Sequence, residues 1–556
     1  MNYRTEKVFI ISLDGATWDV LRPLIQQGYL PNLAKMLKAG VGSELQSVVP
    51  PVTAPAWTSF MTGKHPSKHG VFDFTHFDER DYSWKINNSD HIRTKTIWQL
   101  LSDKGKRVIT LNLPYTYPPY EVDGIIVSGW DAPFLDGKFT YPESLSKEIL
   151  EEFPDYADNL DLPLSSNQPT KSDELFNRFV GKIIAGAEQG TKLASRFLQN
   201  EKWDVFMLHF QQPDWMQHNL WVYIEEACSA NPQKSERAIK TRDCYQSMDR
   251  MVGDLLKLLD SNKTFKVVLS DHGFGRNRGN ICPNYYLREW GYLAPAKPAE
   301  GSVTKFYNRA ARAVKRALAP PANKSVSSKS LRSFGSFVEM INATAPHQRV
   351  SLDWTKTKAA LAVGSETGFV YVNVKGRSPL GIVEPGAEYD KLVDELISKF
   401  KEVQHPKTKE KLFAQVSKGS DIYPEKLDGV ILPDIVLIPT EGFKFSFEIS
   451  DVPPELSTHG NHRTEGVLIV EGSGMNHPDA KFHPRLIDLA PTILHILGLP
   501  VPKDMDGRVL QELFPTAQAV QFEDIDNSIV RHEKMEYNAE ETELIEQRLK
   551  GLGYIE

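Results

Sequence analysis

Three apolar segments that end in acidic or histidine side chains constrain the fold most strongly. They are residues 8–14 (VFIISLD), residues 205–218 (VFMLHFQQPDWMQH) and residues 266–273 (KVVLSDHG). The segments deliver, in chain order, Asp14, then Asp214 and His218, then Asp271 and His272. Continuous apolar runs are typical of buried parallel strands, whose carboxyl ends meet at one edge of a sheet. We therefore predict an α/β fold in which a doubly wound, mostly parallel sheet, with helices on both faces, gathers these side chains.

The spacing within these segments favours a metal site. Asp214 and His218 are four residues apart, so both side chains face one point on a helical turn. Any one Asp–His pair is more often a hydrogen-bonded loop pair than a set of metal ligands. The recurrence of such pairs, each at the end of an apolar run, is difficult to explain by chance.

A fourth segment, residues 44–70 (ELQSVVPPVTAPAWTSFMTGKHPSKHG), contains a candidate nucleophile, Thr53. Prolines on both sides of Thr53 restrict the backbone, so we expect the chain to leave a strand here and turn sharply. Residues 56–62 then begin a helix that Gly63 closes, and free N–H groups at its start favour an anion. A hydroxyl attacks phosphorus at neutral pH only when a base or a metal activates it. For an isolated Thr-x-Pro, a helix cap is the commoner interpretation, but here the acidic segments supply an activator.

Composition narrows the class of protein. The 556 residues include 72 acidic and 65 basic side chains, and the net charge of −7 argues against a general nucleic-acid binder. Three cysteines without CxxC spacing (Cys228, Cys244 and Cys282) suggest structural thiols in a reducing compartment. The first strand is expected within a few residues of the N-terminus, which leaves no room for a signal peptide. No apolar run approaches the roughly 20 residues of a membrane helix, so we expect a cytoplasmic protein without a transmembrane segment.

Strands and helices alternate over the first half of the chain. We expect helices over residues 20–27, 31–39, 97–104, 174–198 and 236–259, and strands over residues 108–112 and 124–129, in addition to the apolar runs. We interpret residues 1–295 as the first part of the core and residues 431–530, which include PDIVLIP at 433–439, as its second part. Strands separated by helices support the parallel sheet.

The remaining residues are predicted to form an inserted cap and a tail. We assign residues 296–430 to a cap that shapes substrate specificity, with a helix over residues 389–402. Within it, residues 305–319 (KFYNRAARAVKRALA) form a predicted basic helix, for which a solvated face is the simplest interpretation and an anionic substrate or membrane surface the alternative. Residues 531–556 form a helical tail, whose Leu544, Ile545 and Leu549 are expected to dock on the core.

Taken together, these segments resemble the alkaline phosphatase superfamily. The order Asp-Gly, Thr-x-Pro, Asp-x-x-x-His, Asp-His-Gly and a late His is similar to the type I phosphodiesterase/nucleotide pyrophosphatase branch and its bacterial phosphohydrolase and phosphomutase relatives. Further sequence segments that resemble this family are MTGKHPSKHG, GNHRTEGVLIVEG and LAPTILHILGLPVPKDMDG. The resemblance runs from about residue 7 to the C-terminus and is weakest over residues 295–430. It implies one metal held by Asp14, Thr53, Asp271 and His272, and a second held by Asp214, His218 and a late histidine.

Two late histidines compete for that position. His459 resembles the histidine of the phosphodiesterases, whereas His462 resembles that of the bacterial group. His462 lies five residues before the apolar run 467–470, close to the usual spacing in the superfamily. We therefore predict His462 as the ligand and His459 as a partner that orients it.

The resemblance also implies a reaction. Two divalent ions, expected to be Zn²⁺ with Mn²⁺ as the alternative, would activate Thr53 to attack a small phosphate ester and form a phospho-threonine that water then hydrolyses. This sequence departs from the phosphodiesterases at Phe74, where those relatives carry an asparagine that binds a phosphoryl oxygen. Arg276 and Arg278 are our candidates to replace it, with Lys64 and Lys68 as further candidates; a surface salt bridge is the simpler interpretation for each.

Three functions follow from this pattern. The first is a metal-dependent phosphohydrolase that cleaves a phosphodiester or phosphomonoester. The second is a phosphomutase or phosphotransferase that passes the phosphoryl group to another hydroxyl. The third, a non-catalytic metal-binding scaffold, is disfavoured because such a protein is expected to have lost a ligand or the nucleophile. A sulfatase is disfavoured because that branch needs Cys or Ser at the Thr53 position.

Overall fold

The computed structural model describes residues 6–133, 137–156, 169–231, 233–296, 351–449, 457–476, 482–515, 519–526 and 535–552. The predicted basic helix over residues 305–319 lies outside these described ranges.

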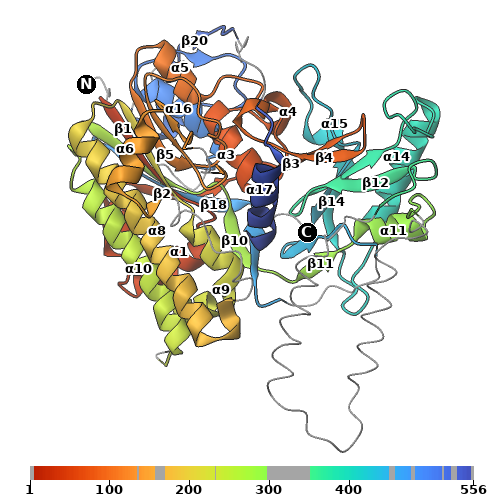
Figure 1. The fold of residues 1–556 in the computed structure, drawn as a ribbon, viewed down its shortest axis with the longest axis horizontal. Helices are drawn as coiled ribbons and strands as arrows, with labels where there is room; N and C mark the ends of the chain where they lie inside the picture. Colours follow the sequence, from red (N-terminus) through yellow and green to blue (C-terminus); the bar gives the residue numbers. More distant parts are fainter. Residues whose placement is uncertain are drawn as a thin grey trace, which may run out of the picture.

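An eight-stranded, mostly parallel sheet forms the centre of the larger part of the molecule (Figure 1). Its strand order is β2-β18-β9-β1-β8-β5-β6-β7. The strands are β1 (Lys7–Leu13), β2 (Val41–Gln46), β5 (Val108–Leu113), β6 (Gly124–Ser128), β7 (Thr140–Tyr141), β8 (Val205–Phe210), β9 (Thr264–Leu269) and β18 (Glu465–Glu471). The pairs from β9 through β1, β8 and β5 to β6 are parallel, whereas β18 and β7 join antiparallel to their neighbours. The predicted α/β fold with a mostly parallel sheet is confirmed.

The apolar runs become the central strands for a simple reason. In β8 and β9 all residues are buried, and in β1 only Lys7 is not, because helices cover the sheet on both faces. The parallel register places Leu13 opposite Phe210 and Ser12 opposite Leu269, so the three strands end at the same level. The residues that follow them therefore emerge side by side.

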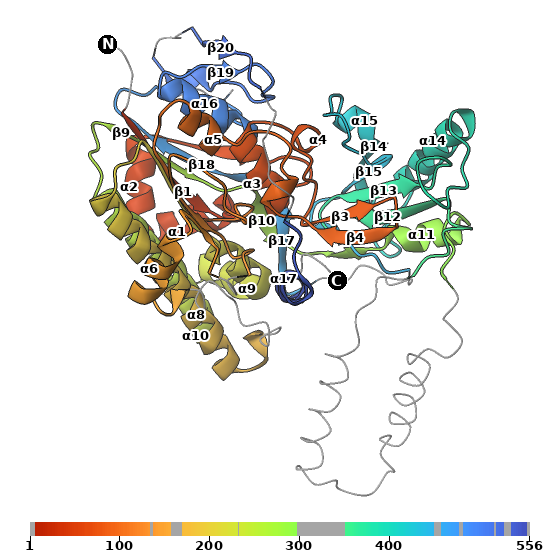
Figure 2. The same ribbon diagram turned by 45° about the horizontal axis from the view of Figure 1, so that its top comes forward.

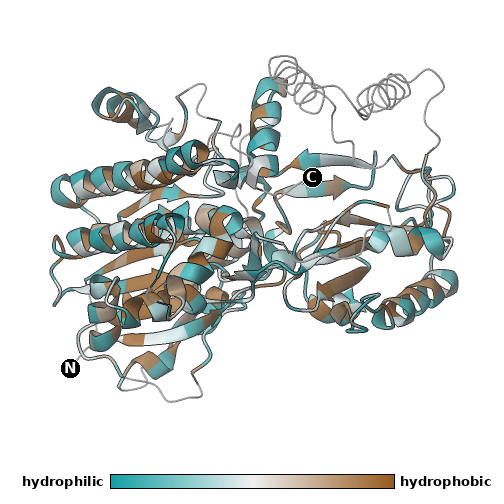
Figure 3. Ribbon diagram, turned by 90° about the horizontal axis from the view of Figure 1, so that it is seen from below, coloured by the Kyte–Doolittle hydropathy of each residue, from teal (hydrophilic) through white to brown (hydrophobic). Residues whose placement is uncertain are grey.

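Helices pack on both faces of this sheet (Figures 1 and 2). One group is α1 (Trp18–Gln26), α2 (Pro31–Ala39), α8 (Asp173–Asn200), α9 (Gln212–Cys228) and α10 (Glu236–Leu256); the other is α3 (Thr53–Thr62), α5 (Ile97–Asp103) and α16 (Leu489–Ile496). The long helices carry hydrophilic and hydrophobic residues side by side in Figure 3, as helices with one buried face do. The Ser172 side chain caps α8 by accepting a hydrogen bond from the Leu175 N–H.

A second, four-stranded sheet forms the smaller part of the molecule, the cap. Its order is β12-β13-β15-β14, from β12 (Ala359–Val363), β13 (Gly368–Val372), β14 (Phe413–Lys418) and β15 (Ile435–Pro439), with α14 (Ala387–Lys401) packed on β14. We predicted that residues 433–439 return the chain to the core, and this was wrong, because β15 pairs with β13 and β14 in the cap sheet. An apolar run such as IVLIP does not indicate which of two sheets will bury it.

Short strands connect the cap to the core. β10 (Gly273–Arg276) pairs with β17 (Gly460–Arg463), and β11 (Gly279–Ile281) pairs with β16 (Phe443–Phe445). The hairpin of β3 (Thr75–Asp78) and β4 (Ser83–Ile86) extends from the core to β12. Shorter elements are α4 (Pro66–His69), α6 (Leu145–Glu152), α11 (Pro283–Glu289), α15 (Gly419–Ile422), β19 (Val501–Pro502) and β20 (Phe522–Glu523).

The C-terminal helix α17 (Ala539–Leu552) docks on the core as predicted. Ile545 and Leu549 are buried in the main hydrophobic cluster, and Arg548 donates hydrogen bonds to the carbonyl oxygens of Trp130 and Ala132. Among the helices that the structure describes, none has the length and apolar character needed to span a bilayer.

Candidate active site and metal centre

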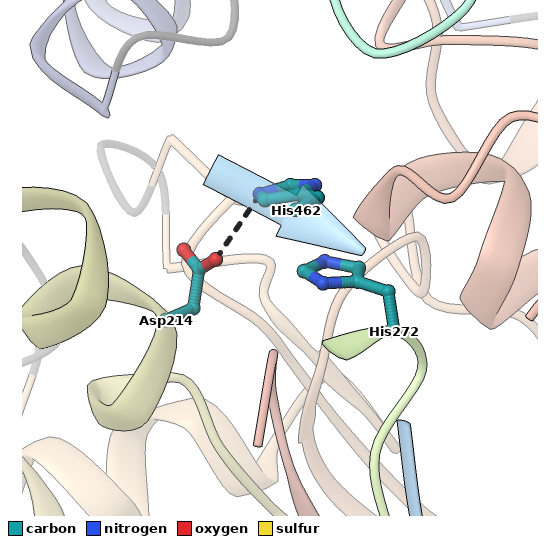
Figure 4. A group of neighbouring side chains, drawn as sticks. All are labelled: Asp214, His272 and His462. Atoms are coloured by element: carbon teal, nitrogen blue, oxygen red, sulfur yellow. Dashed lines mark ion pairs between the residues drawn. The ribbon is translucent and has the colours of Figure 1, made fainter. Parts of the chain in front are cut away.

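Six of the predicted metal ligands meet at the carboxyl edge of the central sheet. Asp14 follows β1, Asp271 and His272 follow β9, Asp214 and His218 lie on the first turns of α9, and His462 lies on β17. Two buried groups have donor atoms within 4.8 Å of one another: Asp14 with Asp271 and His272, and Asp214 with His272 and His462. Figure 4 shows the second group, with residues from three separate segments pointing toward one another.

The first group lies beside Thr53. The His272 Nε2 atom lies 3.3 Å from Asp271 Oδ2 and 3.7 Å from Asp14 Oδ1. The Thr53 Oγ1 atom lies 3.4 Å from the same Nε2. Thr53 is the first residue of α3 and is fully buried, so its hydroxyl faces the cluster rather than bulk water.

The second group adjoins the first. Asp214 Oδ1 lies 3.3 Å from His218 Nε2 and 3.4 Å from His462 Nε2, and the two imidazole nitrogens are 2.9 Å apart. The His272 and His462 rings stack with centroids 3.7 Å apart. The two groups therefore form one continuous cluster of carboxylate and imidazole donors.

Burial gives this cluster unusual electrostatics. Burial, followed by the negative charges of Asp271 and Asp214, raises the pKa of Asp14 well above its ordinary value. Burial also raises the pKa of Asp271 to about 7. Burial, with the neighbouring His462 adding to it, lowers the pKa of His272 well below its ordinary value. Carboxylates crowded in this way favour an added positive charge, which a bound cation can supply in place of a proton.

The donor set fits divalent metal ions. Asp14 Oδ1 and Asp271 Oδ2 are buried oxygens without a hydrogen-bond donor among the described residues. Buried carboxylate oxygens are normally paired, and coordination of a cation satisfies them. Mixed carboxylate and imidazole ligation suits zinc and also accepts manganese.

Residues that the sequence analysis did not identify hold these ligands in place. Trp57 Nε1 donates to Asp14 Oδ2 at 2.9 Å, the Gly15 N–H donates to Asp271 Oδ1 at 3.1 Å, and Gln211 Nε2 donates to Asp214 Oδ2 at 3.2 Å. Each hydrogen bond occupies one oxygen of the carboxylate, so the other oxygen of that carboxylate faces the cluster. Trp57 follows Thr53 by one helical turn, and that spacing is the signal that could have identified it.

The structure separates the two late histidines. His462 is buried, and its Nδ1 atom lies 3.0 Å from the Pro51 carbonyl oxygen, which leaves Nε2 directed at Asp214. His459 is exposed, and its Nδ1 atom lies 3.0 Å from the backbone carbonyl oxygen of His218. His462 therefore lies in the cluster, while the His459 ring contacts the backbone carbonyl of a cluster residue.

The cations proposed to replace the family asparagine are engaged elsewhere. Each forms an ion pair: Arg276 with Glu225, Arg278 with Glu410, Lys64 with Asp504, and Lys68 with Asp506 and Glu425. Both arginines line a cavity of about 720 Å³ together with Trp221 and Glu441. These contacts match the simpler interpretation of surface salt bridges, and they give no support to phosphate binding by the four cations.

Phe74, at the asparagine position, is a core residue. It is buried and packs on Tyr115 and Trp130, with ring centroids 6.0 and 5.6 Å away. Phe74, where the resemblance would place an asparagine, therefore makes an apolar core contact.

Two charged residues from the cap side also act on the cluster. Glu366, at the tip of the β12–β13 hairpin, is buried, and its negative charge acts on His462. Lys444, on β16, is half-buried, and its positive charge acts on His218. No motif marks either residue in the sequence, and Glu366 lies in the region that resembles the family least.

Comparisons with known proteins agree with this geometry. The family model for type I phosphodiesterase / nucleotide pyrophosphatase matches residues 8–467. The fold is similar to phosphonoacetate hydrolase from Sinorhizobium meliloti 1021 (15% identity, 89% of this chain and 96% of that chain, TM-score 0.54). It is also similar to alkaline phosphatase PafA (13% identity, 92% and 99%, TM-score 0.52) and to human ectonucleotide pyrophosphatase / phosphodiesterase 5 (15% identity, 92% and 100%, TM-score 0.50).

The family match covers most of the chain, and the solved structures share its fold across nearly their whole length. The chain therefore belongs to the type I phosphodiesterase / nucleotide pyrophosphatase family, and it is a phosphoester hydrolase.

Proposed function

We propose that the protein hydrolyses a phosphodiester or phosphomonoester through a covalent phospho-threonine at Thr53. The observation that carries the proposal is the position of the Thr53 hydroxyl, buried at the start of α3 and 3.4 Å from His272 in the carboxylate cluster. A hydroxyl at a helix N-terminus lies beside free N–H groups, which bind the oxygens of a phosphoryl group.

Different residues of the chain would bind the metal ions and orient the ligands. Asp14, Thr53, Asp271 and His272 would hold one divalent ion, and Asp214, His218 and His462 a second. Such ions, which we propose to be Zn²⁺ with Mn²⁺ as the alternative, lower the pKa of a bound hydroxyl and stabilise charge on phosphorus. Trp57 and Gln211 keep the carboxylates oriented through the hydrogen bonds described above.

In the reaction, Thr53 Oγ1 gives its proton to solvent water and forms a bond to phosphorus while the bond to the leaving oxygen breaks. The leaving alcohol acquires a proton from the solvent. Water then attacks the phospho-threonine, releases the phosphate product and restores the Thr53 hydroxyl. In-line attack requires the leaving group to lie opposite Thr53, on the side where Asp214 and His462 face the cluster.

Lys444 is our candidate for the contact that the family asparagine would make. Its charge acts on His218, and among the described residues no carboxylate lies within ion-pair distance of its ammonium group. The four other candidate cations are already neutralised by carboxylates. A cation of this kind binds a phosphoryl oxygen by a charge-assisted hydrogen bond.

The test is a panel of phosphodiesters, phosphomonoesters and nucleotides, assayed with protein loaded with Zn²⁺ or Mn²⁺. Hydrolysis predicts free alcohol and a phosphate product, whereas a phosphomutase would return a rearranged phosphate ester. Binding of metal without turnover of any ester would instead support a non-catalytic scaffold. The cytoplasmic location expected from the cysteine pattern stays a prediction.

A further inference from the structure

A buried carboxylate from the cap stands next to the proposed active site. Glu366 is 7% exposed and lies in the loop 364–367 between β12 and β13. Burying a carboxylate is costly unless a cation or hydrogen-bond donors accompany it. Among the residues that the structure describes, however, no donor lies within hydrogen-bond distance of the Glu366 carboxylate.

Contacts on two sides hold this loop beside the cluster. On one side, the Phe445 N–H donates to the Ser365 carbonyl oxygen at 2.7 Å, and Asn461, the neighbour of His462, donates to the Phe443 carbonyl oxygen at 3.3 Å. β16 thus connects the loop directly to the strand that carries His462.

On the other side, the cap reaches the segment that precedes Thr53. Phe369 packs edge-on against Phe72, which packs against Tyr423, with ring centroids 5.8 and 5.3 Å apart. The Tyr423 hydroxyl donates to the Val49 carbonyl oxygen at 2.6 Å. The Glu366 loop is therefore held in a fixed position relative to both Thr53 and His462, and specific binding of a substrate requires such a fixed position.

The charges that face Glu366 are already committed to other groups. The His462 imidazole is directed at Asp214 through Nε2, 3.4 Å away, and at the Pro51 carbonyl oxygen through Nδ1, 3.0 Å away. The Arg463 guanidinium donates to the carbonyl oxygens of Asn461, His462 and Arg276 and lies 3.5 Å from Glu441. Among the described residues, Glu366 forms an ion pair with neither His462 nor Arg463, whose side chains are held by these other groups.

We infer that Glu366 is a specificity-determining residue that binds an ammonium group on the organic part of the phosphate ester. A carboxylate beside the phosphoryl site repels an anionic substrate, so it favours binding only if the substrate brings a positive charge to it. The expected substrates are zwitterionic: a phosphate ester that carries an amine a few bonds from phosphorus. This inference rests on the proposed function, because it places the phosphoryl group at Thr53.

The test is calorimetric binding of two uncleaved probes to the metal-loaded protein. The probes, 2-aminoethylphosphonate and propylphosphonate, match in size and differ in one ammonium group. We expect the wild-type protein to bind the amino probe about tenfold to a hundredfold more tightly, the effect of one charge-assisted hydrogen bond in a buried site. Glu366→Gln should remove this preference by weakening binding of the amino probe, and propylphosphonate affinity should stay the same or rise, because the carboxylate no longer repels an anion.

A matched control is Glu402→Gln, because Glu402 is an exposed cap carboxylate; it should keep the preference. Equal binding of the two probes by the wild-type protein, or a preference that persists in Glu366→Gln, would overturn the inference. Glu366→Asp, with a shorter carboxylate, should retain part of the preference and separates loss of charge from loss of fold. The measurement does not depend on turnover, so it can fail while ester hydrolysis holds, and the reverse.

Discussion

Replacing each of the two late histidines by alanine should have clearly different effects on metal binding. His462 is buried, and its Nε2 lies 3.4 Å from Asp214 and 2.9 Å from His218, so His462→Ala removes one of the three proposed donors to the proposed second ion. The remaining aspartate and histidine should not retain that ion through dialysis. We expect bound metal to fall from two equivalents to one and activity to be lost.

His459→Ala is the comparison, because His459 is exposed and its ring nitrogen Nδ1 lies 3.0 Å from the backbone carbonyl of His218, outside the cluster. Loss of an orienting partner typically costs about 10–100-fold in metal affinity or activity, or roughly 1.4–2.7 kcal/mol. This variant should therefore keep two equivalents of metal and lose only part of its activity. The assay is metal content by mass spectrometry after dialysis, with circular dichroism to confirm folding. Loss of metal in His459→Ala, with full retention in His462→Ala, would refute the assignment.

Three further perturbations test other parts of the account. Lys444→Gln should lower kcat/KM about tenfold or more, mainly by raising KM. The control, Lys401→Gln on the exposed side of α14, should change neither kcat nor KM. Equal effects of the two substitutions would contradict the role of Lys444. Leu549→Ala should lower the free energy of unfolding by about 3 kcal/mol in urea, because Leu549 is 1% exposed. The control, Gln547→Ala, should change it by about zero, because Gln547 is exposed. Equal urea midpoints for the two variants would show that α17 does not dock stably. Burial raises the pKa of the Asp131 carboxyl to about 6, above the ordinary 3.8. The stability that Asp131 gives the folded protein is therefore fully present below about pH 3.8 and is lost as the pH rises through 6. Asp131→Asn should therefore lose less stability than wild type between pH 4 and 7, by about 3 kcal/mol, and parallel melting curves against pH would contradict this.

The parts of the fold that follow from local pattern could be predicted from the sequence. The predicted helix over residues 31–39 has the same bounds as α2. The predicted helix over residues 236–259 starts with α10 and runs past its end at Leu256. The apolar runs before Asp14 and Asp271 are central strands because their burial on both faces requires a continuous apolar sequence. The ligands at their ends follow from the geometry of parallel sheets.

Features that depend on distant contacts could not be predicted. The apolar run at residues 433–439 forms β15, but the choice between core and cap sheet depends on pairing with β13 and β14. The ion pairs of Arg276 and Arg278 join residues 51 and 132 positions apart, which no local pattern reveals. Glu366 and Lys444 likewise reach the cluster only through the packing of the cap.

The most direct test of the central claim is to trap the covalent intermediate on Thr53. The metal-loaded protein is mixed with a substrate found in the ester panel, quenched in acid within one turnover, digested and analysed by mass spectrometry. We predict a phosphorylated peptide with the modification on Thr53, absent from Thr53→Ala, which should keep its metal but lose turnover, because Asp14, Asp271 and His272 still hold the first ion. Substantial hydrolysis by Thr53→Ala, without phosphorylation of the wild-type peptide, would contradict the covalent route and make water the nucleophile.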